Sequence, residues 1–165
     1  MKGKLSPYDL MVVSKYFETI DDFINMELGI TKARCNMEKF HFNPIALDEW
    51  SRQFFTSLET LHVYTKEDNT FPEETFYQII IHFPIEYKEW VEKKKENEIY
   101  KHVILEEETS EALETIPEGI TEIENDCFSE RDDLEELIIP DSVTSIRRGF
   151  LCECEELTAM TIPTH

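Results

Sequence analysis

The sequence is poor in the residues that enzyme sites and nucleic-acid surfaces need. Only 4 glycines occur among 165 residues, so no glycine-rich loop that cradles phosphate can form. Neither the HExxH signature of zinc proteases nor the GxSxG signature of serine hydrolases occurs. Against 36 Asp and Glu there are 16 Lys and Arg, and a net charge of −20 disfavours nucleic acid and anionic membranes as partners. We therefore expect a non-enzymatic protein with no catalytic residue and no cofactor.

Cysteine is also scarce, and the four thiols do not form a recognisable zinc site. They are Cys35, Cys127, Cys152 and Cys154, and no CxxC pair occurs among them. We interpret them as small buried side chains, which fits a reducing compartment. No apolar run is long enough to span a membrane, and Asp9 interrupts any apolar segment typical of a signal peptide. The expected location is the cytoplasm, and the alternative is the cell surface, reached by non-classical export.

What the sequence does contain is a repeat of 23 residues in its last third. Ile116-Pro117, Ile139-Pro140 and Ile162-Pro163 recur at that interval. Residues inside the copies also correspond in pairs: Ile120 and Val143, Thr121 and Thr144, Ile123 and Ile146, Leu134 and Leu157, Leu137 and Met160. A period of this length is typical of a solenoid, in which no single repeat can bury its apolar face alone.

These residues also carry a family resemblance. The run from Ile139 to Ile146 (IPDSVTSI), with the downstream residues Phe150, Cys154 and Leu157, closely resembles the BspA-type leucine-rich repeat. The preceding copy departs from that pattern at Arg131, where Cys is usual. The stretch from Leu10 to Pro44 also looks like the amino-terminal region of amoebal members of the family. The resemblance implies a protein–protein interaction module without catalysis, and some relatives are proposed to be surface adhesins.

An apolar spacing extends the repeat towards the amino terminus. In the clear copies the inner strand has apolar residues at its first, fourth and sixth positions, as in Leu134, Leu137 and Ile139. The same spacing starts at four upstream residues: Met37, Leu58, Phe76 and Tyr100. The polar stretch 106–114 is interpreted as a distorted linker. We therefore predict an α/β leucine-rich-repeat solenoid of stacked short parallel strands, with a helical cap at 1–36, an irregular repeat-like region at 37–110 and BspA-type repeats at 111–165.

Short amphipathic helices are expected before the first repeat. Ser6-Pro7 is typical of a helix start, and Thr19 with Asp22 resembles a capping box. Gly29 is expected to end the second helix, and a third is expected from about Thr31. Such helices would cover the open end of a solenoid. They also resemble an F-box, which implies the alternative of a ubiquitin-ligase substrate adaptor.

The candidate binding surface is the outward strand position between the last two apolar residues of each strand. It is occupied by His41, His62, Ile80, Ile104, Ile138 and Thr161. Strands stacked in order would place these residues in one row, about 4.8 Å apart, and exposed isoleucines in such a row typically mark a partner site. The alternative is that a helix expected from Glu86 to Asn97 covers them. His41 and His62 are expected as neighbours, but no third ligand has metal-site spacing, so no metal is expected.

The acidic surface and the final strand bear on the partners. The acidic runs recur with the repeat and are interpreted as solvated outer loops, with an acidic surface that steers a basic partner as the alternative. The last expected strand, Leu157 to Ile162, is followed by no capping segment in this sequence. We expect its open edge to form a homodimer, or the natural protein to be longer. The function expected is therefore protein binding through the strand face.

Overall fold

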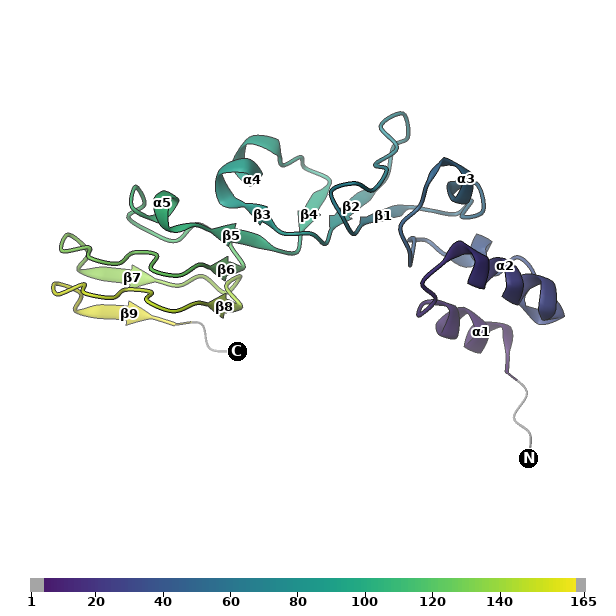
Figure 1. The fold of residues 1–165 in the computed structure, drawn as a ribbon, viewed down its shortest axis with the longest axis horizontal. Helices are drawn as coiled ribbons and strands as arrows, with labels where there is room; N and C mark the ends of the chain where they lie inside the picture. Colours follow the sequence, from purple (N-terminus) through teal and green to yellow (C-terminus); the bar gives the residue numbers. More distant parts are fainter. Residues whose placement is uncertain (1–4, 163–165) are drawn as a thin grey trace. The chain divides into compact units, whose positions relative to one another are not determined.

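The computed structural model describes residues 5–162 and combines short helices with parallel strands (Figure 1). Two compact units emerge, the first formed by Met1–His82 with Asn97–Ile99 and the second by Phe83–Glu96 with Tyr100–His165. The segments 1–36, 37–110 and 111–165 follow the repeat pattern rather than compactness, and they stay a prediction. The mixed α/β content and the parallel pairing fit a leucine-rich-repeat fold.

The first unit begins with two capped helices, α1 (Pro7–Ser14) and α2 (Ile20–Gly29). Each has the reciprocal hydrogen bonds of a capping box, from Asp9 N to Ser6 Oγ at 3.2 Å in α1 and from Asp22 N to Thr19 Oγ1 at 3.3 Å in α2. The predicted helix starts and the end of α2 at Gly29 are therefore confirmed.

The expected third helix is wrong, because only two short 3-10 turns follow, η1 (Thr31–Ala33) and η2 (Met37–Lys39). The carboxylate of Glu27 accepts hydrogen bonds from Cys35 N at 3.2 Å and from Met37 N at 2.8 Å. These amides are therefore unavailable to a helix, and Cys35 has a φ of 55°, which breaks a right-handed helix. Ala33 and Met37 are nevertheless buried, as their spacing predicts.

Three aromatic rings form the centre of the first unit. Phe23, Phe40 and Phe55 are at most 2% exposed, and their rings meet edge to face with centroids 5.6–6.0 Å apart. This geometry is favourable for aromatic pairs and adds to the hydrophobic stabilisation of their burial. The rings join α2 to the segments before β1, which include the short helix α3 (Glu49–Arg52).

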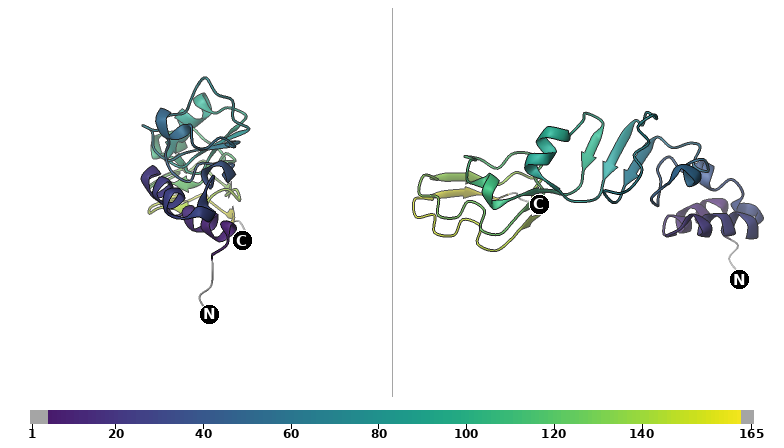
Figure 2. Two further views of the ribbon diagram at one scale, coloured as in Figure 1. Left: turned by 90° about the vertical axis from the view of Figure 1, so that its right-hand side faces the viewer. Right: turned by 45° about the horizontal axis from the view of Figure 1, so that its top comes forward.

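The sheet of the first unit has the order β1 (Thr60–Val63), β2 (Gln78–Ile81) and β4 (Glu98–Tyr100), and Figure 2 shows β1 and β2 side by side. Leu61 pairs with Ile79 and Val63 with Ile81, the register that the apolar spacing predicts. The first predicted strand is wrong by three positions, since Phe42 bridges Thr60 rather than Val63.

The side chain of Asn43 explains this shift. It is fully buried, and its Oδ1 accepts from His62 N at 2.7 Å while its Nδ2 donates to His62 O at 2.7 Å. The amide therefore takes up the backbone groups of β1 that a longer neighbouring strand would pair.

The second unit contains two sheets rather than the single series of strands that the spacing predicts. One has the order β3 (Ile85–Glu86), β5 (Val103–Leu105), β6 (Glu122–Ile123) and β8 (Ser145–Ile146), and the other pairs β7 (Glu136–Ile138) with β9 (Ala159–Thr161). Each 23-residue repeat contributes one strand to each sheet, as the pairs Glu122 with Ser145 and Leu137 with Met160 show. Pro163 of the third Ile-Pro pair lies outside the described residues.

Repeat-to-repeat contacts build the core of this unit. Two matching pairs of apolar positions are buried in both copies, Ile116 with Ile139 and Ile120 with Val143, and Ile123, Leu134 and Leu137 are buried in the first copy. Threonine hydroxyls join adjacent copies, because Thr144 Oγ1 donates to Thr121 O at 3.1 Å and Thr121 Oγ1 donates to Val103 O at 3.2 Å. The helix expected from Glu86 to Asn97 is present in shorter form as α4 (Tyr87–Lys93), whose Trp90 packs against this core.

The stretch 106–114 is more ordered than the distorted linker that its polarity predicts. It contains the short helix α5 (Glu107–Ser110), which ends at a fully buried serine. The guanidinium of Arg131 closes this end by donating from Nη1 to the carbonyl oxygens of Ser110, Glu111 and Leu113 at 3.0–3.2 Å. Its other nitrogens bind Asp133 at 2.6 and 2.7 Å. The arginine therefore supplies donors that a cysteine at this position could not.

Candidate functional site

The six residues of the predicted outward row do not form one row. His62 is paired with Ile80, Ile104 with Glu122, and Ile138 with Thr161, each pair in a different sheet. The expectation that Ile104 and Ile138 are successive members of one row is wrong, because each repeat contributes one strand to each of two sheets. The assignment of these residues to partner binding stays a prediction.

His41 and His62 are not neighbours, which corrects the second expectation for this row. His41 precedes the bridge between Phe42 and Thr60, and its carbonyl accepts from Glu59 N and Thr60 N at 2.9 Å. Its exposed ring lies 3.3 Å from the carboxylate of Glu59. Among residues 5–162 no three His, Cys, Asp or Glu side chains are grouped as a metal site requires.

Four half-buried rings lie together beside Ile80 in the first unit, and we call them the ring cluster: Phe42, His62, Tyr64 and His82. Strand alternation places them together, because Tyr64 follows His62 by two residues and His82 follows Ile80 by two. The ring of Phe42 stacks on His62 at 5.0 Å, and that of Tyr64 stacks on His82 at 4.9 Å. Sequence reasoning identified His62 and Ile80 but missed the other three rings, which the two-residue spacing indicates.

Hydrogen bonds fix the orientation of the ring cluster. His62 Nδ1 lies 3.1 Å from His82 Nε2, so one imidazole donates and the other accepts. The hydroxyl of Tyr64 donates to Asn43 O at 2.8 Å. Burial raises the pKa of Tyr64 to about 12, with a smaller contribution from the negative charge of Asp68. The ammonium of Lys15 lies 5.4 Å from the centroid of Phe42 and adds a positive charge beside the rings.

The outward positions of the second unit differ in exposure. Ile104 is half-buried next to Glu122, whose carboxylate lies 3.2 Å from His102 Nδ1 and 3.5 Å from Arg147 Nη2. Ile138 is 63% exposed, and Thr161 beside it is exposed as well. The alternative that α4 covers the isoleucines therefore does not hold for Ile138.

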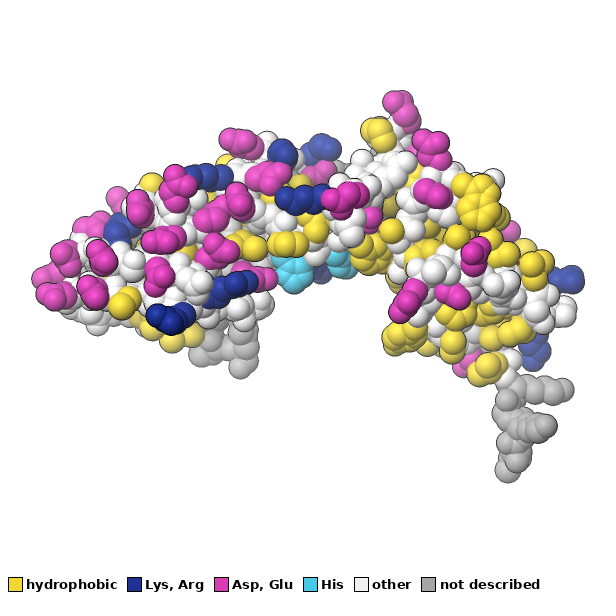
Figure 3. Space-filling model, in the orientation of Figure 1, with side chains coloured by type: hydrophobic (Ala, Val, Ile, Leu, Met, Phe, Trp, Pro, Cys, Tyr) yellow, Lys and Arg dark blue, Asp and Glu magenta, His cyan; other side chains and the backbone are white. Residues whose placement is uncertain are grey.

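Acidic side chains dominate the visible surface around the repeats of the second unit, as Figure 3 shows. Glu130, Asp132, Glu153 and Glu155 line one shallow depression of about 310 Å³ there. Residues 132 and 155 occupy the same place in successive copies, 23 residues apart, as do 130 and 153. Asp132, Glu153 and Glu155 belong to the predicted acidic runs and are exposed, as that prediction of solvated loops requires.

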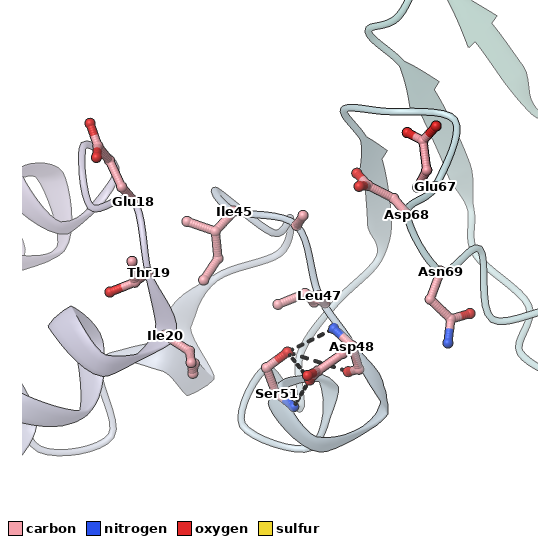
Figure 4. A pocket seen from close by; sticks show the side chains of 11 residues that line it. Glu18, Thr19, Ile20, Ile45, Leu47, Asp48, Ser51, Glu67, Asp68 and Asn69 are labelled. Carbon is pink, nitrogen blue, oxygen red and sulfur yellow. Dashed lines mark hydrogen bonds between the residues drawn. The ribbon is translucent and has the colours of Figure 1, made fainter.

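The first unit also contains a groove that was not predicted from the sequence, because four separate segments of the chain line it (Figure 4). These are the start of α2, residues 45–48, α3 and the loop after β1. The groove has a volume of about 470 Å³, within the range of about 300–1,000 Å³ typical of ligand sites. No Lys, Arg or His is found among its described lining residues.

Comparison with known proteins adds one finding. Residues 97–165, less than half of the chain, match the family model described as "BspA type leucine rich repeat region (6 copies)". No curated protein and no solved structure matches the chain. The resemblance to BspA-type leucine-rich repeats is thereby confirmed for these residues, while the amoebal type and the F-box likeness of the first helices stay predictions. Leucine-rich repeats generally mediate protein–protein interaction.

Proposed function

We propose that this chain is a non-enzymatic protein-interaction module that binds a partner protein through the outward faces of its parallel strands. The ring cluster beside Ile80 is the observation that supports this proposal best. Its rings are held in place by stacking and hydrogen bonds, yet each keeps part of its surface in solvent. Rigid aromatic rings with polar atoms are enriched in protein interfaces, because they supply contact area at small entropic cost.

The test is affinity capture of a partner from the source cells, followed by a dissociation constant for the purified partner. Wild type is compared with His62→Ser and with His62→Glu/Ile80→Glu, and Val91→Glu at an exposed position of helix α4, outside the strand faces, serves as the control. We expect the dissociation constant to rise tenfold or more in both variants of the ring cluster and to stay unchanged in the control. The milder serine variant keeps the test valid if the double variant unfolds by circular dichroism. Equal binding by folded variants and wild type would remove the ring face from the proposal.

We also propose that the repeats stack as a solenoid and that α1 and α2 cap its first repeat. The pairing of successive copies at a constant 23-residue interval in both sheets of the second unit supports the solenoid. Burial of Leu10, Phe23 and Met26 on α1 and α2 supports a packed helical layer in the first unit.

A substrate-adaptor function is the second candidate, supported by apolar side chains left exposed around α1. Tyr8 is 69% exposed and Tyr16 83%, and Leu5 and Val13 add further apolar surface. Such a surface fits a second protein docking on the helices. Binding of a purified F-box-binding scaffold subunit, and its loss in Tyr8→Asp/Tyr16→Asp, would support the adaptor. No binding at micromolar concentration would exclude it.

The remaining proposals concern the partner and the compartment. The net charge of −20 favours a partner with a basic surface, and four free cysteines favour the reducing cytoplasm over the surface of an adhesin. Immunofluorescence on intact and on permeabilised cells distinguishes the two locations.

Among the described strands β9 pairs with β7 alone, which supports a homodimer through its free edge. Sedimentation velocity at high concentration tests that dimer.

A further inference from the structure

The groove of the first unit combines an apolar floor with an acidic rim. Ile45 and Leu47 form the floor and are 7% and 5% exposed. Four carboxylates line the groove as well: Glu18, Asp48, Glu67 and Asp68. Figure 4 shows these side chains arranged around the open space from both sides of the segment 45–48.

Two of the four carboxylates are held rigidly. Asp48 accepts hydrogen bonds from Ser51 N and Ser51 Oγ, both at 2.7 Å, and these bonds lower its pKa. Asp68 accepts from Tyr64 N at 2.7 Å and from Thr65 Oγ1 at 2.6 Å. Each therefore presents a fixed negative charge at the groove without conformational cost when a cation arrives.

The other two carboxylates are available to a ligand. Glu18 and Glu67 are exposed, and neither side chain makes a hydrogen bond or an ion pair with another described residue. Within residues 5–162 no basic side chain lines the groove, so no lining residue neutralises its four negative charges. A cationic group entering the groove gains from all four and displaces no existing partner of Glu18 or Glu67.

We propose that this groove binds a short segment of a partner protein in which one aliphatic side chain lies between Lys or Arg residues. The aliphatic side chain contacts Ile45 and Leu47, and the flanking cations lie against the rim. The inference is independent of the strand-face function, since none of the six outward-row residues lines the groove. It names a second surface of the first unit and the chemistry of the segment that it binds.

Fluorescence anisotropy with a labelled peptide, GSKRLKRSG, tests the proposal on the full chain. We expect saturable binding that weakens as salt rises from about 50 mM to about 500 mM, because salt screens surface charges. Glu18→Gln/Glu67→Gln is expected to weaken binding about tenfold. The control, Glu130→Gln/Glu153→Gln, changes the net charge equally at an acidic depression of the second unit and is expected to shift binding less than about twofold.

The contribution of the floor is tested with a peptide in which Ser replaces Leu, for which about fivefold weaker binding is expected. Equal weakening by both glutamine pairs would show attraction by net charge alone and would overturn the proposal. Equal affinity for the Ser peptide would also overturn the proposal. So would complete displacement of the labelled peptide by an equimolar polyamine such as spermine. Either result would show that the apolar floor contributes nothing to the affinity. Failure of the peptide to bind leaves the strand-face test unaffected, since that test uses variants of β1 and β2.

Discussion

The indole of Trp90 lies directly over Gly119, so close that a β-carbon on this glycine would be 2.9 Å from Cη2 of the ring. Gly119 has a φ of +94°, a conformation that side chains with a β-carbon rarely adopt. Its amide also donates to Ser142 Oγ of the next repeat at 3.1 Å. This one glycine therefore allows α4 to pack on the repeats and joins two of them.

We predict that Gly119→Ala destabilises the second unit by about 1–3 kcal/mol, from backbone strain and from displacement of the indole. Thermal unfolding followed by Trp fluorescence measures the change. Gly29→Ala is the matched control, because a β-carbon there meets nothing within 4 Å. This variant should be as stable as wild type or slightly more stable. A Gly119→Ala variant as stable as wild type would show that the indole contributes little to packing.

Asn43 is predicted to be the most sensitive polar residue of the first unit. Asn43→Leu leaves the backbone N–H and C=O of His62 and the carbonyl of Ile45 without their buried partner. A loss of roughly 2–4 kcal/mol is expected, because unsatisfied buried polar groups are costly. Urea denaturation measures it, with the exposed Asn25→Ala on α2 as a control expected to lie within about 0.5 kcal/mol of wild type. Similar stabilities for the two variants would contradict the role given to this amide.

The raised pKa of Tyr64 predicts sensitivity to alkali. The folded protein favours the neutral phenol, with a pKa of about 12 against an ordinary value of 10, so the unfolded chain loses this proton first. Stability from this group is complete below pH 10 and is lost as pH rises from about 10 to about 12. The phenol is only half-buried, so solvent screens part of this effect. We therefore expect the free energy of unfolding to fall by about 1–2 kcal/mol, less than the rise in pKa alone would give. In Tyr64→Phe this part of the pH dependence should disappear, and its persistence would assign it to another group.

The interpretation of all four cysteines as buried side chains is wrong for Cys35 and Cys152, which are exposed, while Cys127 is buried. Thiol reactivity should therefore separate the two kinds of cysteine. Cys127 is fully buried, its Sγ lies 3.3 Å from Leu105 O, and burial raises its pKa to about 11. At pH 8 iodoacetamide should modify the exposed Cys152 rapidly and leave Cys127 unmodified until denaturant is added. Mass spectrometry of the digested protein follows both sites. Modification of Cys127 at the rate of Cys152 would show that the second unit opens frequently under native conditions.

Local and periodic features of the fold could be predicted from the sequence. Thr19 and Asp22 define a helix start by themselves, because a capping box needs only residues three apart. The pairing of Leu61 with Ile79 and of Leu137 with Met160 follows from apolar spacing, since a slip of one residue would expose the whole inner face.

What could not be predicted depends on residues that replace backbone pairing with side chains. Asn43 shifts the first strand by pairing with His62, and a sequence pattern based on apolar residues contains no signal for such a bond. Arg131 orders α5 from 21 residues away, so the polarity of that stretch alone is misleading. The groove joins segments that lie far apart in the chain, and only the folded first unit brings them together.

Because every 23-residue copy supplies one strand to each of two sheets, length and register are linked in the second unit. Duplicating one whole copy would add a strand to both sheets and leave each existing pairing intact. An insertion within a strand would displace the pairs of that strand, whereas a turn between strands can absorb added residues. Duplication of a whole copy therefore lengthens both sheets together, which makes these repeats a modular scaffold.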